Sequence, residues 1–348
     1  MKKYYAGLNL YRFLAAAMVA FFFHYRIVLG DSPFAGTTVG DFLNANGGYV
    51  VELFFIISGF VACNAYLKRI SDGTLKFKEF IISRIKRMYP TLIISVTVVF
   101  VLMWLGYAIW DTPLIKDSAT SPFAFILNML GLNGGIIAES SFVSVNGPSW
   151  YVSVLMVCYL LFFVISLFSH KSEGGAIVLF IVVIIIGLFV YLNPVNLPFL
   201  SLSCARGYIY FFIGVIWAKI QSRLSFKGSI ITCVLSVVMI LMFVFAYYHD
   251  LLYQESLEVG LCIVLPLVLI GLNVSGFNKI CDNRPVRFLG NISYGIFMWN
   301  IPTFVCVRLI EQTAGIDFDY GNIWVYLAIV VINIIAGTLS YEFIEKQK

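Results

Sequence analysis

An arginine and a histidine share one apolar stretch near the start of the chain, residues 8–29. Arg12 and His24 are 12 residues apart, which corresponds to about 18 Å along a helix. A charge inside a bilayer costs about 2.5–3.5 kcal/mol, so it needs a partner or a function. Arg12 could be an anchor that extends to the membrane surface, and His24 could be an interfacial residue bonded to a neighbour. Alternatively they are catalytic, because histidine is well suited to act as a general base near neutral pH.

A carboxylate begins the second apolar stretch, residues 47–67. Glu52 needs a cation or a hydrogen-bond donor there, and two roles are open: pairing with Arg206 or orienting His24. Ser58 and Gly59 follow in the middle of the stretch. Residues this small allow the backbone of another helix to approach closely.

A basic segment, residues 68–87, follows the second stretch. One interpretation is that its charges set the membrane orientation and contact lipid headgroups. A sharper one is a phosphate site, because arginine binds phosphate with two parallel hydrogen bonds and coenzyme A carries several phosphates. Arg84 and Arg87 are the candidates for that site.

The composition of the chain predicts an all-α, polytopic transmembrane helix bundle. Of its 348 residues, 61% are hydrophobic and 12% are charged, against about 25% charged in a soluble domain. In lipid, backbone groups must bond within their own helix, so long apolar stretches predict helices. Ten stretches are long enough to span the bilayer: 8–29, 47–67, 89–110, 149–169, 174–193, 205–222, 227–248, 256–275, 287–309 and 322–343.

The loop charges predict an orientation with both termini in the cytoplasm. With that orientation, basic residues concentrate in the inner loops near 68–87, 219–227 and 279–287, and acidic residues in the outer loops. The pattern requires that the shorter segment 123–135 does not cross, so we expect it to be re-entrant or interfacial. The net charge of +5 is spread over short loops and does not indicate nucleic-acid binding. Seven cysteines without a C-x-x-C pair predict neither a disulfide framework nor a metal site.

Seven short motifs follow one another between residues 10 and 345. They are Leu10-Tyr11-Arg12-Phe13-Leu14 with His24, Phe54-Phe55-x-x-Ser58-Gly59-Phe60, Arg84-x-x-Arg87-x-Tyr89-Pro90, Pro148-Ser149-Trp150-Tyr151-Val152-Ser153, Arg206-Gly207 with Phe212-Ile213-Gly214, Phe288-Leu289-Gly290-Asn291-Ile292-Ser293-Tyr294, and Ser340-Tyr341-Glu342 with Glu345. In this order they resemble the motifs of the membrane-bound acyltransferase family 3, whose members modify bacterial surface glycans. The resemblance covers the chain as a single domain, 1–348, and we expect no appended soluble domain.

The resemblance implies transfer of an acyl group, usually acetyl, from cytoplasmic acyl-CoA to a hydroxyl of a surface glycan. No permanently bound cofactor is implied, since acyl-CoA is a co-substrate. The implied partners are membrane lipid, a glycan or lipid-linked sugar acceptor and glycan-assembly proteins, and the implied location is the bacterial inner membrane. The resulting candidates are catalytic His24, Arg12 and Glu52; donor-binding Arg84, Arg87, Tyr89 and Ser58; and acceptor-binding Trp150, Ser153, Arg206, Tyr294 and Asn300.

Three departures from the family pattern carry expectations. The family usually separates its arginine and histidine by 11 residues, whereas 12 residues would place Arg12 and His24 about 120° apart on a regular helix. We therefore expect a π-bulge or a non-helical start near Arg12. Asn300 stands where many members have a histidine, so it either orients the acceptor or marks altered chemistry. Leu155 stands where a glutamate often follows the tryptophan motif.

The leading hypothesis is thus an integral membrane O-acyltransferase. A transporter or flippase for a lipid-linked sugar is the alternative from another class, because composition alone fits both. A catalytically altered relative kept for assembly is the third possibility, suggested by Asn300.

Overall fold

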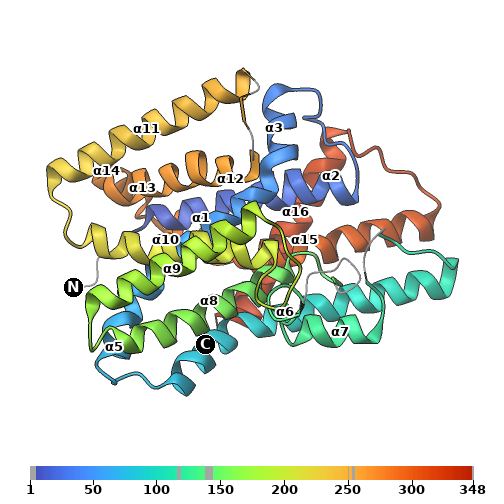
Figure 1. Cartoon of the computed structure of the whole chain (residues 1–348). Coiled ribbons are helices and arrows are strands. Elements are labelled where there is room, and N and C mark those ends of the chain that lie inside the picture. The colour runs from blue at the N-terminus through green and yellow to red at the C-terminus, as the bar shows by residue number, and fades with distance from the viewer. Residues whose placement is uncertain (1–4, 116–118, 138–143, 250, 253–254, 347–348) are drawn as a thin grey trace.

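The fold is a bundle of long helices that run side by side (Figure 1). In this computed structural model the described residues are 5–115, 119–137, 144–249, 251–252 and 255–346. Residues 1–4 and 347–348, whose side of the membrane is predicted above, lie outside this part of the chain. The bounds of the α-helices are α1 (Gly7–Met18), α2 (Tyr25–Val28), α3 (Thr38–Asn46), α4 (Val51–Ala62), α5 (Lys68–Ser71), α6 (Phe77–Trp110), α7 (Pro122–Met129), α8 (Ser149–Phe168), α9 (Glu173–Leu192), α10 (Leu202–Gln221), α11 (Phe226–Tyr248), α12 (Glu255–Val259), α13 (Leu265–Asn273), α14 (Ser275–Cys281), α15 (Arg284–Ala314) and α16 (Ile323–Ser340).

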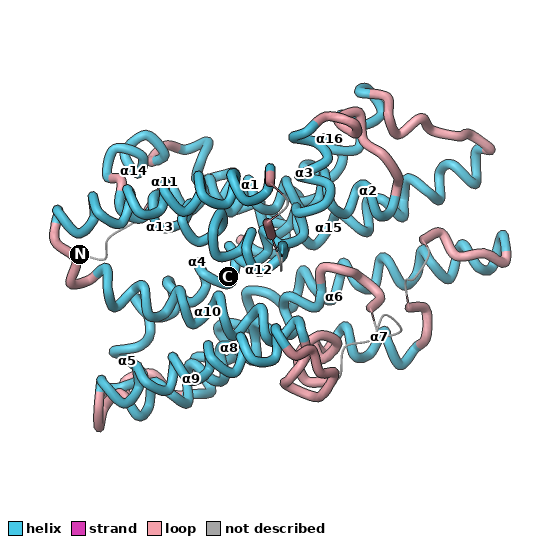
Figure 2. Tube along the Cα trace, turned by 45° about the horizontal axis from the view of Figure 1, so that its top comes forward, coloured by secondary structure: helices cyan, strands magenta, loops and turns pink. Residues whose placement is uncertain are grey.

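Short helical segments with a tighter (3₁₀) or wider (π) pitch join some of these α-helices. They are the 3₁₀ turn η2 (Gly47–Val50) and the π-helical segments η1 (Val19–His24), η3 (Cys63–Leu67), η5 (Gly260–Val264) and η6 (Tyr341–Glu345). Figure 2 shows that most of the described chain is helical, with loops joining the helices. The all-α prediction is confirmed for the described residues.

Eight helices in the described ranges are long and apolar enough to cross a membrane, and the number rises to nine if one bent pair counts as a span. The bent pair is Leu257–Asn273 with Ser275–Cys281, at 85°. The remaining predicted stretch, 205–222, forms α10, a 20-residue helix that is not among these spans. Because α10 packs against α4 and α9, much of its surface faces protein instead of lipid, and it can carry Arg206 and Lys219.

Two glycines set the close contact between α4 and α10. A Cβ atom added to Gly59 would lie 1.9 Å from the Phe211 carbonyl oxygen, and one added to Gly214 would lie 2.1 Å from that of Ile56. No side chain fits at either position, so the two backbones touch directly. This confirms the prediction of a close backbone approach at Ser58-Gly59.

The segment 123–135 does not form a spanning helix. Helix α7 has 8 residues, which corresponds to about 12 Å of length. Turns and a bend follow it as far as Ile137, the end of this described range. A helix this short covers less than half of a hydrocarbon core of about 30 Å. The prediction that the segment does not cross the membrane is confirmed.

A polar network ties α7 and the turns after it to the start of α8. The Asn128 side-chain oxygen accepts hydrogen bonds from Asn133 (3.2 Å) and from the Ser149 hydroxyl (2.8 Å), and all three side chains are buried. Gly134 donates its backbone N–H to the Ser153 hydroxyl at 3.2 Å. These bonds satisfy polar groups that would otherwise be buried without partners, and they fix the beginning of α8.

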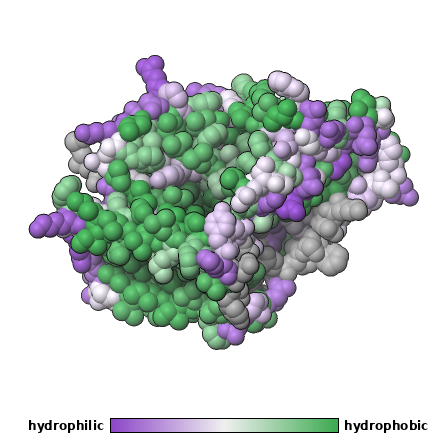
Figure 3. Space-filling model, turned by 90° about the horizontal axis from the view of Figure 1, so that it is seen from above, coloured by the Kyte–Doolittle hydropathy of each residue, from purple (hydrophilic) through white to green (hydrophobic). Residues whose placement is uncertain are grey.

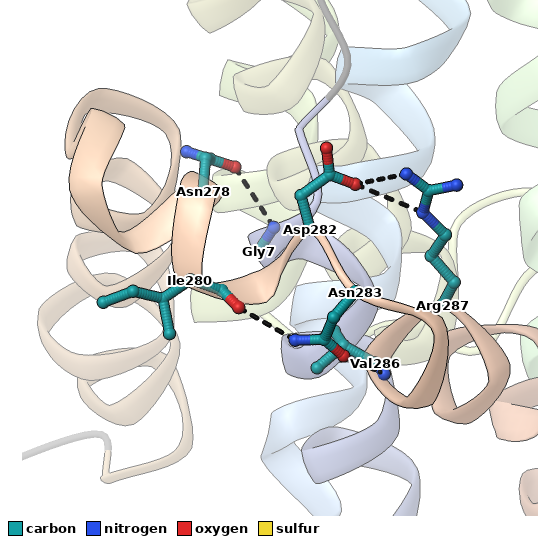
Figure 4. A network of polar contacts seen from close by, with 7 residues as sticks. All are labelled: Gly7, Asn278, Ile280, Asp282, Asn283, Val286 and Arg287. Atoms are coloured by element: carbon teal, nitrogen blue, oxygen red, sulfur yellow. Dashed lines mark hydrogen bonds and ion pairs between the residues drawn. The ribbon is translucent and has the colours of Figure 1, made fainter.

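The first helix is anchored at its start by α14 and the segment that leads into α15 (Figure 4). The Gly7 backbone N–H donates to the Asn278 side-chain oxygen at 3.1 Å, and the Tyr11 ring stacks on Phe277 with centroids 5.3 Å apart. Asp282 and Arg287 form an ion pair in the same region. The contacts of Gly7 and Tyr11 fix the first turns of α1, which carry the candidate arginine.

The outer surface of the bundle is broadly apolar. Figure 3 shows a broad hydrophobic area on one side of the view, bordered by hydrophilic residues. Helix α11 contributes strongly, since many of its large apolar side chains are exposed, among them Leu241, Met242 and Phe245. Such a surface fits a lipid environment and not water.

The first span changes its helical pitch before it reaches His24. Helix α1 is regular through Arg12, and the π-helical segment η1 then covers Val19–His24. A π turn accommodates one extra residue, so a separation of 12 behaves like a separation of 11 on a regular helix. The predicted π-bulge exists, but its predicted place near Arg12 is wrong, because it lies beside His24.

Candidate functional site

A cavity of about 250 Å³ lies between α1, α4, α6, α8, α15 and η6. Three guanidinium groups line it, Arg12 from α1 and Arg84 and Arg87 from α6, together with one carboxylate, Glu345 from η6. We call this space the arginine cavity. With three cations and one anion on its walls, it favours an anionic ligand.

Arg84 is held in place by aromatic side chains. It is 7% exposed, and its guanidinium donates hydrogen bonds to the Tyr66 hydroxyl at 2.5 Å and to the Ser83 hydroxyl at 3.3 Å. The guanidinium carbon also lies 4.7 Å from the Tyr66 ring centroid and 5.5 Å from that of Tyr159. Aromatic faces stabilise the cation without neutralising it, so its charge still acts on the cavity.

Arg12 and Arg87 form no ion pair among the described residues. Neither side chain makes a hydrogen bond with that part of the protein, although both line the arginine cavity. Their donors are therefore free to bind a ligand. The guanidinium fork suits phosphate or carboxylate oxygens.

Glu345 is a cavity residue that the sequence analysis named only as part of a motif. One of its carboxylate oxygens accepts hydrogen bonds from the Thr91 hydroxyl at 3.2 Å and the Ser340 hydroxyl at 3.0 Å. The π-helical segment η6 directs both Tyr341 and Glu345 at the cavity. The last motif of the chain was the only sequence signal for it.

The other predicted donor-binding residues divide into two groups. Ser58 lines the arginine cavity, and its hydroxyl lies 3.4 Å from that of Tyr151. Tyr89 does not line it, and its hydroxyl donates to the Leu130 carbonyl oxygen at 2.9 Å. Leu155, at the position where a glutamate often stands in the family, is an apolar part of the cavity wall.

A second, smaller cavity of about 70 Å³ lies at the other end of the first span. His24, Trp150, Arg206 and Gly48 are among the residues that line it, and we call it the histidine pocket. A Cβ atom added to Gly48 would lie 2.8 Å from the Phe23 ring, so a larger residue there would crowd the pocket wall. The pocket thus joins the candidate base to two of the predicted acceptor-binding residues, Trp150 and Arg206.

Glu52 and Arg206 form a buried ion pair beside the histidine pocket. The Arg206 Nε lies 2.6 Å from Glu52 Oε1, and its Nη2 lies 3.0 Å from Oε2. Nη2 also donates to the Gly48 carbonyl oxygen at 2.9 Å, and the guanidinium carbon lies 4.7 Å from the Trp150 ring centroid. Of the two roles left open for Glu52, the structure supports pairing with Arg206. The two opposite charges make this part of the pocket neutral overall.

His24 meets Asn300 within hydrogen-bonding distance. The Nδ1 atom of His24 lies 3.1 Å from Oδ1 of Asn300, whose side chain is fully buried on α15. Asn300 does not line the histidine pocket, so it contacts His24 but not a ligand that would occupy the pocket.

Two predicted acceptor-binding residues lie elsewhere. Ser153 bonds to the backbone of Gly134, as described above, and lines neither cavity. Tyr294 lines the arginine cavity, and its hydroxyl donates to the Met88 carbonyl oxygen at 2.9 Å. The structure therefore places Tyr294 with the candidate donor-binding residues.

Three aromatic rings form a cluster on the wall of the arginine cavity. The Phe54, Tyr151 and Phe297 rings contact one another, with centroids 5.6–5.9 Å apart. All three line the arginine cavity, and Phe297 lines the histidine pocket as well. We call these rings the aromatic cluster. The sequence analysis did not single out Phe297.

Comparison with known proteins identifies the family. The sequence model of acyltransferase family 3, described as an acyltransferase domain, matches residues 5–342. The chain belongs to acyltransferase family 3. This family membership supports an enzyme over the transporter alternative, and the arginine cavity and histidine pocket are the candidate active site of an acyltransferase. No solved structure matches the chain significantly.

Curated relatives of this family 3 chain carry related names. It is 26% identical over 337 residues to the peptidoglycan O-acetyltransferase OatA of Listeria monocytogenes, covering 88% of this chain and 52% of the relative. It is 22% identical over 330 residues to the O-acetyltransferase OatA of Staphylococcus aureus, covering 86% and 52%. The chain therefore spans about half the length of these relatives.

Proposed function

We propose that this protein transfers a short, uncharged acyl group, acetyl, from acyl-CoA to a hydroxyl of a bacterial cell-surface glycan. The observation that carries the proposal is the pair of cavities that meet at Phe297, with unpaired arginines in one and His24 in the other. Peptidoglycan is the first acceptor to test, since it is named in the Listeria relative.

The donor is assigned to the arginine cavity on its charge. Coenzyme A has a phosphorylated nucleotide head and a thin, flexible arm that ends in the thioester. Arg12 and Arg87, which have no ion pair in the described chain, supply free donors for phosphate or for the polar arm, and Arg84 adds a third positive charge. Phe297 lines both cavities, so the path of the arm toward His24 runs past this ring.

The residues beside the histidine pocket support acetyl as the acyl group. Its cation, Arg206, is already paired with Glu52 through two hydrogen bonds. A succinyl group would bring a free carboxylate into a pocket whose positive charge is neutralised, and burying an unpaired charge is costly. An acetyl group carries no such charge, and it is small enough for a pocket of this size.

Transfer requires one proton acceptor and one leaving group. His24 removes the proton of the acceptor hydroxyl as the oxygen attacks the thioester carbonyl carbon. The carbon–oxygen bond forms, the carbon–sulfur bond breaks, and the coenzyme A thiolate takes the proton from the imidazolium. Trp150 lines the pocket where a sugar ring would lie and offers an aromatic face to it.

The orientation in the membrane is part of the proposal. The loops near 68–87 and 219–227 are basic, which supports a cytoplasmic position for the arginine cavity and an outer position for the histidine pocket. The donor is then taken from the cytoplasm of a bacterial cell and the acceptor from outside the inner membrane. Glycan-assembly proteins are the partners that would present the acceptor.

The test uses purified protein in lipid nanodiscs with radiolabelled acetyl-CoA and glycan fragments, and mass spectrometry of the glycan product. We expect a mass increase of one acetyl group per modified hydroxyl, little transfer from succinyl-CoA, and none from the His24→Gln variant. Equal transfer by His24→Gln would refute the base assignment. Sugar movement across the membrane without acetylation would support the transporter alternative instead.

A further inference from the structure

The side chain of Asn300 is fixed between two partners inside the bundle. Its Nδ2 donates a hydrogen bond to the Phe297 carbonyl oxygen at 2.7 Å, and its Oδ1 lies 3.1 Å from Nδ1 of His24. A backbone carbonyl oxygen can only accept a hydrogen bond, so the amide nitrogen must face Phe297. The amide oxygen must then face His24.

The orientation of the amide determines where the histidine carries its proton. The Asn300 Oδ1 atom accepts hydrogen bonds and cannot donate them, so the bond to His24 requires a proton on Nδ1. A neutral imidazole has a single N–H. Nε2 therefore has a free lone pair, and it is the nitrogen that can take a proton.

A proline two residues after Asn300 supports the same geometry. Pro302 has no N–H, so the Met298 carbonyl oxygen, four residues earlier in α15, lacks its helical donor. The Asn146 side chain donates to this oxygen instead, at 3.1 Å. A hydrogen-bonded side chain thus replaces the missing helical bond beside Asn300, and this fixes the part of α15 that carries it.

We propose that Asn300 is a positioning residue that holds neutral His24 in the Nδ1–H tautomer and leaves Nε2 as the basic atom toward the histidine pocket. The use of that nitrogen to deprotonate a hydroxyl rests on the proposed function, whereas the tautomer itself does not. During transfer the hydroxyl proton moves to Nε2, and the Nδ1–H bond to Asn300 stays in place in the imidazolium. Asn300 thereby orients the base without titrating.

The tautomer can be measured directly, because the chain has only three histidines, His24, His170 and His249. ¹⁵N NMR of protein labelled at histidine, in lipid nanodiscs, distinguishes a protonated from an unprotonated ring nitrogen. The signals of His24 are assigned as those lost in His24→Gln. We expect a protonated Nδ1 and an unprotonated Nε2 in the unmodified protein. A protonated Nε2 would overturn the proposal.

Three variants test the role of Asn300. Asn300→Leu removes the acceptor, so we expect a mixture of His24 tautomers and a kcat about 10- to 100-fold lower, with KM for acetyl-CoA changed less than about twofold. Asn300→His can accept from His24 with one nitrogen and donate to Phe297 with the other, and we expect it to restore the tautomer and most of kcat. Asn333→Leu is the matched control, since Asn333 is equally buried and bonds to Thr303 at 3.3 Å.

The outcomes separate this proposal from the proposed function. An unchanged tautomer in folded Asn300→Leu would refute the positioning role. If Asn300→Leu does not fold, the tautomer of the unmodified protein and that of Asn300→His still decide the question. A protonated Nδ1 together with full transfer by His24→Gln would leave the tautomer assignment standing and refute the catalytic base.

Discussion

The buried ion pair between Glu52 and Arg206 gives a sharp prediction for stability. The Glu52 side chain is 2% exposed and that of Arg206 16%, so neither charge is well solvated. Removing one partner of such a pair typically costs about 3–5 kcal/mol, because the other charge stays buried without compensation. We expect Arg206→Met to lower the free energy of unfolding by about 4 kcal/mol and Glu52→Gln by about 3 kcal/mol.

The double variant shows whether the two losses of unfolding free energy are coupled or additive. With both charges removed, no uncompensated charge remains, and the residual loss comes from the missing donor to the Gly48 carbonyl oxygen and the missing contact with Trp150. We expect the double variant to be no less stable than Arg206→Met, which corresponds to a coupling energy of about 3 kcal/mol.

The assay is reversible unfolding of the purified protein in mixed micelles, followed by far-ultraviolet circular dichroism. All four proteins of the cycle are compared under the same lipid and detergent conditions. Single-variant losses that simply add in the double variant would refute the reasoning, since they would mean that the two side chains do not interact in the folded protein.

Three further predictions concern the cavities and the helix contact. Arg12→Ala should raise KM for acetyl-CoA by about 10- to 100-fold in steady-state kinetics, because it removes one charge-assisted hydrogen bond to the donor. Arg12→Lys keeps the charge and should raise KM less. Phe297→Trp should lower kcat more than it raises KM in the same assay, because a larger ring in the aromatic cluster obstructs the acyl arm. Gly59→Ala should reduce the yield of folded protein measured by size-exclusion chromatography, because the added Cβ would lie 1.9 Å from a carbonyl oxygen. Gly276 has open space around it, so Gly276→Ala should leave the yield unchanged.

Local sequence patterns predicted the spans and part of the site. Apolar length and charge identified the helices and the short segment that does not cross, because both depend on nearby residues only. Compared with the separation of 11 residues that is usual in the family, the separation of 12 between Arg12 and His24 predicted a π-bulge or a non-helical start near Arg12. Its position was not predictable, because the packing of Phe23 against Gly48 joins two separate stretches of the sequence.

Long-range contacts account for most of what was missed. Nothing near Asn300 in the sequence indicates that its amide meets His24, 276 residues away. Tyr294 and Tyr89 carry hydroxyls that were expected to bind substrates, but both donate to backbone carbonyls of neighbouring segments. Phe297 looked like one apolar residue among many, and only the arrangement of α4, α8 and α15 places it on the walls of both cavities.

The charged residues of α10 have a consequence for how the protein is made. This helix carries Arg206, whose counter-ion Glu52 is synthesised 154 residues earlier on α4. A segment that partitions poorly into lipid by itself needs a polar partner on a helix that has already been inserted into the membrane. Co-translational insertion of α10 should therefore depend on α4, so that the residues shaping the histidine pocket also set the order of assembly during biogenesis.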